Sequence, residues 1–133
     1  MGTPRSYRDD VRWIPCRNVG AYDIPGFSLI RVVDVDGDGT HQVAAPNVES
    51  DPCLFFSQEA TILKGARGNC TKDFPWWVSY APADGTPLTG QSWGSIAGTG
   101  ANAADWQLHR ASSGFRIGGG ANGRIVEAGC SCS

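Results

Sequence analysis

The sequence predicts an all-β fold, either a sandwich of short strands or a small barrel, with a C-terminal β-hairpin extension. Three observations support this prediction. The chain has 18 glycines and 8 prolines among 133 residues, so turns interrupt it too often for long helices. No apolar period of 3.6 residues continues for as long as about ten residues. About nine short apolar or aromatic runs are separated by turn signals, a spacing typical of sandwiches and barrels.

The first 45 residues alternate turns with short strands. Residues 1–10 are polar and charged, and we expect an arm without a core of its own. Residues 11–14 predict a short strand. Residues 27–35 carry apolar side chains on both faces, so we expect a central strand covered on both sides. The Asp-Gly pairs at residues 36–39 predict a tight turn, after which residues 40–45 return as the second strand of a hairpin.

The same pattern continues to the end of the chain. Further strands are expected at residues 53–56, 59–63, 76–80, 105–110, 115–117 and 124–127, with a glycine-containing link at residues 64–68. Residues 81–90 form a loop rich in proline and glycine, which is a candidate subdomain boundary. The part that follows is too small for an independent core. We therefore expect residues 11–133 to form a single β domain.

Charge and hydropathy exclude several classes of partner. The net charge of −2 provides no long-range attraction to phosphates, so we expect no nucleic-acid partner. The first twenty residues contain no apolar run of the kind found in secretory signals. No apolar run is long enough to cross a bilayer, so we expect no membrane partner. We expect synthesis in a host cytoplasm without a signal peptide.

The chain has five cysteines, which leaves at least one thiol outside any set of intramolecular disulfides. Cys130 and Cys132 could chelate zinc if other residues supplied two more ligands. No CxxC pair supports such a site, and no metal or cofactor is expected. The alternatives are disulfides within or between subunits, formed after release into an oxidising medium, and free or buried thiols.

Asp34, Asp36 and Asp38 alternate as carboxylates do at the start of a calcium loop. An EF-hand would require a glutamate at the twelfth position, where this chain has Ala45. We therefore favour a hairpin turn and keep an opportunistic calcium site as the alternative.

The two histidines, His41 and His109, are expected to be exposed. The sequence contains neither a GxSxG nor an HExxH motif, so no catalytic residue is assigned. A hydrolase that uses one of these histidines with a nearby aspartate is the least favoured interpretation.

The tryptophans exceed the needs of one small core. Trp76 and Trp77 are neighbours on one strand, so their side chains point to opposite faces. A core on one side of the strand can bury only one of these two side chains, so the other must be buried by a different part of the chain or by a partner. This favours a protein interface or a sheet covered on both sides, and a sugar-binding face is the alternative.

A sequence pattern in the second half resembles a known group of proteins. It consists of YAPADG at residues 80–85, GQSWG at 90–94, WQLHR at 106–110 and GFRIGG at 114–119. Over residues 76–119 the chain resembles small β-rich structural proteins of tailed phages and similar reading frames of environmental bacteria. The resemblance implies a virion component, either a head decoration (cement) protein or a neck or tail accessory subunit. It implies no catalytic residues.

Together these observations predict a non-enzymatic capsid decoration subunit, located in the virion, that stabilises the head by protein contacts. The expected partners are the major capsid protein or another virion protein and further copies of the same chain. The residues expected at these contacts are Arg5, Arg8, Arg12, Trp13, Trp76, Trp77 and Trp93. The alternative is a carbohydrate- or receptor-binding module on a tail appendage or an extracellular filament.

Overall fold

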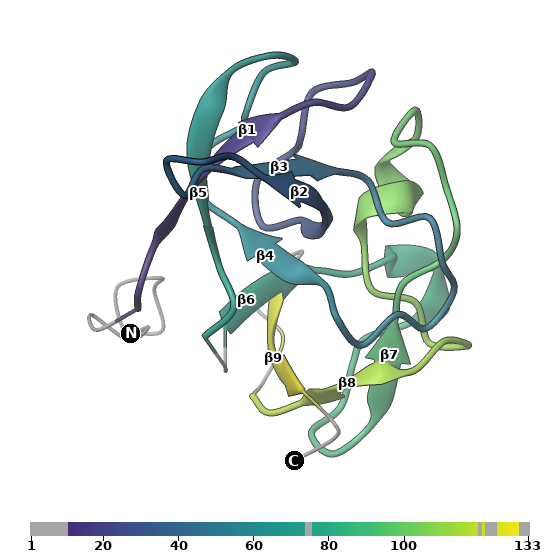
Figure 1. Ribbon diagram of the computed structural model, residues 1–133. Coiled ribbons are helices and arrows are strands. Elements are labelled where there is room, and N and C mark those ends of the chain that lie inside the picture. The colour runs from purple at the N-terminus through teal and green to yellow at the C-terminus, as the bar shows by residue number, and fades with distance from the viewer. Residues whose placement is uncertain (1–10, 74–75, 120, 122–124, 131–133) are drawn as a thin grey trace.

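A computed structural model describes residues 11–73, 76–119, 121 and 125–130. It confirms the all-β prediction, with a five-stranded closed barrel and a four-stranded antiparallel sheet (Figure 1). The expected C-terminal hairpin is present as two neighbouring strands of that sheet. No helix among the described residues is long and apolar enough to cross a membrane.

The barrel contains the first five strands in the order β1-β3-β2-β4-β5, with β5 returning to β1. Their bounds are β1 (Ile14–Asn18), β2 (Leu29–Val35), β3 (His41–Ala44), β4 (Phe55–Ser57) and β5 (Arg67–Thr71). All neighbouring strands are antiparallel except β1 and β3, which run parallel. The barrel is therefore closed by pairing of strands that are far apart in the sequence.

The second sheet has the order β6-β9-β8-β7. Its strands are β6 (Trp76–Ser79), β7 (Ser92–Gly94), β8 (Gly114–Ile117) and β9 (Ile125–Cys130). Leu108 and His109 form backbone bonds with both of its outer strands. Leu108 N donates to Ser79 O (3.0 Å), and His109 N donates to Gly94 O (2.7 Å). The same short segment thus satisfies backbone groups at both edges of the sheet.

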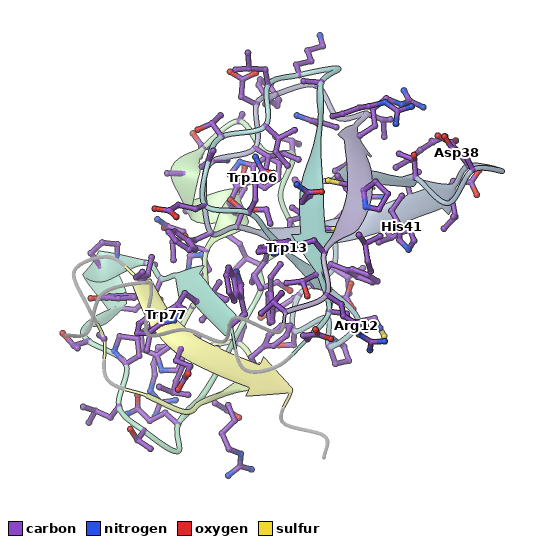
Figure 2. All side chains as sticks on the ribbon, turned by 90° about the vertical axis from the view of Figure 1, so that its left-hand side faces the viewer. Arg12, Trp13, Asp38, His41, Trp77 and Trp106 are labelled. Carbon is purple, nitrogen blue, oxygen red and sulfur yellow. The ribbon has the colours of Figure 1, made fainter. Side chains whose placement is uncertain are left out.

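The predicted hairpin is confirmed as β2 and β3. Asp36 N donates to Thr40 O (2.8 Å), Gly39 N donates to Asp36 O (2.9 Å), and Gly39 adopts a φ of 92°. The prediction that the first strand is covered on both faces is wrong beyond Val32. A register shift follows Val32, and the valines after it are exposed because the hairpin extends away from the barrel, with Asp38 at its tip (Figure 2).

Three expectations in the N-terminal half are corrected. The strand expected at residues 11–14 begins at Ile14 and continues through Pro15 to Asn18. The strand expected at residues 59–63 is absent, and Ile62 forms only an isolated bridge with Ile24. The glycine-containing segment expected to be a link instead leads into β5, because Gly68 lets the backbone pass close to the Ile62 side chain.

The segment expected as a strand at residues 105–110 begins within a 3-10 turn, η3 (Ala103–Trp106), and beyond that turn Leu108 and His109 form isolated bridges. Asn102 and Asp105 form a reciprocal capping box at its start, which favours a helical turn over an extended strand. A second 3-10 turn, η2 (Pro82–Asp84), begins the proline-rich loop.

The described residues form two hydrophobic cores. The barrel core contains Cys16, Ile24, Ile30, Val43, Ala45, Ile62, Cys70 and Trp106. The second core contains Leu29, Leu54, Phe56, Trp76, Val78, Tyr80, Trp93, Leu108, Phe115, Ile117, Val126 and Ala128. Each core includes residues from both halves of the chain. Trp106 from the second half enters the barrel core, whereas Phe56 from the barrel packs in the second core.

Candidate assembly surface

Trp13 is the exposed member of a pair of tryptophans. It lies just before β1, and 42% of its surface is exposed. Its ring meets the ring of Trp76 edge to face, with the centroids 5.1 Å apart and the planes at 89°. Trp76 is buried in the second core, so it gives the exposed ring a fixed support.

Arg12 is held by its backbone while its side chain extends into solvent (Figure 2). Its backbone N donates to Asp73 Oδ2 (2.7 Å), and its Nη2 lies 3.8 Å from Asp73 Oδ1. The Arg12 side chain is 88% exposed. An exposed ion pair of this kind contributes little to stability, so the guanidinium can exchange this carboxylate for another.

A hollow of about 380 Å³ lies beside these residues. It is lined by Arg12, Trp13, Ile14, Lys72 and Asp73, and we call it the Trp13 hollow. The Nζ atom of Lys72 stands 5.0 Å from the centroid of the Phe55 ring, a cation–π contact. An exposed indole, two cations and one carboxylate therefore share one small surface.

Of the predicted interface residues that the structure describes, Arg12 and Trp13 line the Trp13 hollow, and Trp76 contacts the Trp13 ring from the core side. Trp77 is half-buried and packs against the second core. Arg5 and Arg8 lie outside the described residues. The interface prediction for the side chains of Trp76 and Trp93 is corrected, because both are buried core residues.

The surplus of tryptophans has a structural explanation that the sequence did not reveal. A second core exists, and it takes up both Trp76 and Trp93. Trp93 Nε1 donates to Gln91 Oε1 (2.9 Å), which satisfies its polar atom. Trp106 fills part of the barrel core in the same way, and its Nε1 donates to Gly100 O (3.0 Å).

The three aspartates of the hairpin have separate partners. Asp34 Oδ1 accepts from Val35 N, and Asp36 Oδ1 accepts from Gln42 Nε2. Asp38 Oδ1 accepts from Thr40 N. Among the residues that the structure describes, no three His, Cys, Asp or Glu side chains are grouped so that they could hold a metal ion. The hairpin interpretation is confirmed by the pairing of β2 with β3.

His109 is a half-buried residue, which corrects the expectation that it is exposed. Its side chain is 14% exposed, with Nδ1 3.4 Å from Asp84 Oδ2 and Nε2 2.7 Å from Ala104 O. Both ring nitrogens face acceptor oxygens, so neither is directed at a nucleophile. His41 is half-buried too, and its ring lies 5.6 Å from that of Phe55. His109 thus contacts both 3-10 turns, η2 through Asp84 and η3 through Ala104.

Three of the five cysteines have described side chains, and all three are free thiols, one of the alternatives that the sequence left open. Cys132 and the side chain of Cys130 lie outside what the structure describes. Cys53 is a free, exposed thiol, whereas Cys16 and Cys70 are free and buried. Sequence reasoning did not bring these two together, because their proximity depends on the pairing of β1 with β5.

No protein-family model, curated protein or solved structure matches this chain.

Proposed function

We propose that this chain is a non-enzymatic structural subunit of a phage particle, a decoration subunit that binds the capsid through the Trp13 hollow. The observation that carries the proposal is the exposed Trp13 ring, which is supported by Trp76 and flanked by the exposed Arg12. Tryptophan and arginine are the residue types most enriched at energetic hot spots of protein interfaces.

The hollow is prepared for binding before a partner arrives. The Trp13 ring rests on a buried ring, and the Arg12 backbone is anchored to Asp73. The Trp13 side chain is ordered by this ring contact, so it loses less conformational entropy when it binds. The complementary surface would present an apolar group to Trp13 and carboxylates to Arg12 and Lys72. Arg5 and Arg8 belong to the same proposal because they precede this site in the sequence.

The assignment to a virion rests on the resemblance of residues 76–119 to tailed-phage structural proteins. These residues form β6, β7 and β8 and supply much of the second core. In the proposal they form the scaffold that supports Trp13 through Trp76, while the binding contacts come from the N-terminal side of β1. Decoration subunits act as homo-oligomers on a symmetric lattice, so further copies of this chain are also proposed partners.

The test is to measure how many copies of the protein purified particles contain. Hundreds of copies per particle support a decoration subunit, whereas about six or twelve indicate a neck or tail subunit and overturn that assignment. Absence from particles overturns the virion assignment.

A matched pair of variants tests the surface itself. Particles lacking the protein are incubated with purified wild type, Trp13→Ala or Leu88→Ala, and the bound fraction is measured. Leu88 is 62% exposed and does not line the hollow, so Leu88→Ala should bind as wild type does. We expect Trp13→Ala to lose at least about tenfold in affinity. Equal binding by both variants would show that the hollow is not the contact.

A carbohydrate-binding module is the second candidate, and the same exposed ring favours it, because a sugar can stack on an indole beside polar groups. A glycan array distinguishes the two functions. Binding of a defined glycan that Trp13→Ala abolishes, with the fold intact, supports the second candidate over the first.

A further inference from the structure

Two cysteines meet inside the barrel at the seam where its first and last strands pair. In the β1–β5 register, Cys16 lies opposite Gly68, and Cys70 lies opposite Ile14. The two cysteines are thus diagonal neighbours on adjacent strands, and both face the barrel core. Each is 0% exposed, and each is a free thiol.

The two thiols shift each other's pKa in opposite directions. The neighbouring Cys70 thiol lowers the pKa of Cys16, and the Gly68 backbone lowers it further against the opposing effect of burial. The neighbouring Cys16 group, burial and the negative charge on Cys16 raise the pKa of Cys70. A thiolate is the attacking species in disulfide exchange, so within this buried pair Cys16 is the attacking group.

We propose that Cys16 and Cys70 are a redox-active pair that closes into a disulfide across the β1–β5 seam in the presence of a small-molecule disulfide. The Cys16 thiolate attacks one sulfur of that oxidant and releases one thiol. The Cys70 sulfur then attacks the mixed disulfide at Cys16, its proton passes to the departing thiolate, and a second thiol is released. Two protein thiols are oxidised, and one small disulfide is reduced to two thiols.

The cross-link would join two strands separated by about 55 residues of chain. Closing a loop of that length removes many conformations from the unfolded state, so the oxidised barrel should resist denaturation more than the reduced barrel does. The seam is also the place where the barrel ring is completed. Oxidation would therefore close the barrel covalently at this seam.

The inference is independent of the proposed virion function.

Burial makes the pair slow to react. An oxidant reaches Cys16 only when β1 and β5 separate transiently, whereas Cys53 is open to solvent at all times. We therefore expect Cys53 to react first, and low concentrations of urea to accelerate oxidation of the buried pair.

The test uses the full chain carrying Cys53→Ser, Cys130→Ser and Cys132→Ser, so that only the buried pair remains. This variant is incubated with oxidised glutathione, with and without low urea. We expect both thiols to be lost, a mass decrease of about 2 Da from loss of two hydrogens, and a monomer on a non-reducing gel. The unfolding midpoint in urea should rise, and a reductant should return it to its starting value.

Three results would overturn the proposal. These are two thiols that stay free under conditions where urea exposes them, a lasting glutathione adduct on either cysteine, and cross-linked dimers. If the triple variant fails to fold, the wild type is oxidised and mapped by peptide mass instead. A disulfide-linked Cys16–Cys70 peptide supports the proposal, and its absence overturns it. Adding Cys70→Ser to the variant is the matched control, and it should end as the mixed disulfide at Cys16.

Discussion

Trp106 donates its indole N–H to the carbonyl oxygen of Gly100, six residues earlier, while its ring fills the core of the barrel. A Cβ atom at Gly100 would lie 2.8 Å from the Cζ2 atom of that ring, and Gly100 has a φ of 97°. The loop therefore fits closely around the indole because Gly100 has no side chain. The Trp106 ring therefore joins the second half of the chain to the barrel core of the first half.

Replacing Trp106 should destabilise the whole protein. We expect Trp106→Ala to lower the free energy of unfolding by roughly 3–5 kcal/mol, because it leaves a large cavity in the barrel core. Urea unfolding measures the change. Trp13→Ala is the matched control and should cost less, because much of that ring is already in solvent. Equal losses would contradict the assignment of Trp106 to the core.

A close backbone approach makes Gly94 intolerant of a side chain. A Cβ atom there would lie 1.8 Å from the carbonyl oxygen of Ser113. Ser113 immediately precedes β8, the strand with which β7 pairs at Gly94. We expect Gly94→Ala to lower the unfolding free energy by about 1–3 kcal/mol or to prevent folding. Gly37→Ala serves as the control, since a Cβ atom at Gly37 meets nothing within 4 Å. A thermal melt distinguishes the two variants.

Asp38 gives the hairpin a dependence on pH at the acid end. Hydrogen bonds from the backbone and hydroxyl of Thr40, with a smaller effect of Arg67, lower the pKa of Asp38 below its ordinary value of 3.8. Because the folded pKa is lowered, the stabilisation is complete above the unfolded value and is lost as pH falls through the folded value. Wild type should thus exceed Asp38→Asn in stability at neutral pH.

Urea unfolding of wild type and Asp38→Asn at pH 7 and at several values below 4 measures this effect. The two proteins should converge in stability at the acid end, where the aspartate is protonated and resembles asparagine. A stability difference that stays constant over this range would contradict a role for the Asp38 charge.

His109 should contribute to stability and not to catalysis. Its ring lies between the Asp84 carboxylate and the Ala104 carbonyl, so its removal takes away a polar contact between the two 3-10 turns and leaves a gap at a mostly buried position. We expect His109→Ala to lower the unfolding free energy by about 1–3 kcal/mol. Chemical denaturation measures the loss, and Arg110→Ala is the neighbouring exposed control. A wild-type stability for His109→Ala would show that the contact carries no free energy.

Local patterns predicted some elements well. The Asp-Gly turn and the apolar runs beside it correctly located the hairpin of β2 and β3. The runs at residues 76–80 and 115–117 correctly located β6 and β8. Each of these strands has its own apolar or turn signal, which is visible within a few residues. β5 was missed because its segment is mostly polar and carries no apolar run, and only pairing with distant strands makes it extended.

The candidate site was predicted in part. Arg12 and Trp13 were singled out, and the structure places both beside one hollow. The side chains of Trp76 and Trp93 were assigned to the same surface, but they pack in the second core. The large apolar ring of a tryptophan favours burial, but the residue type does not indicate whether the same chain or a partner buries it.

The sequence by itself determined the β class, the central hairpin and the frequency of turns, because these depend on local backbone preferences and on apolar spacing. Only the tertiary structure decided which tryptophans are buried, which chain segment covers the edges of the second sheet and which cysteines meet. Those outcomes depend on strand register and barrel closure between residues far apart in the chain. The meeting of Cys16 and Cys70 follows from the β1–β5 register, in which a shift of one residue would turn one thiol out of the core.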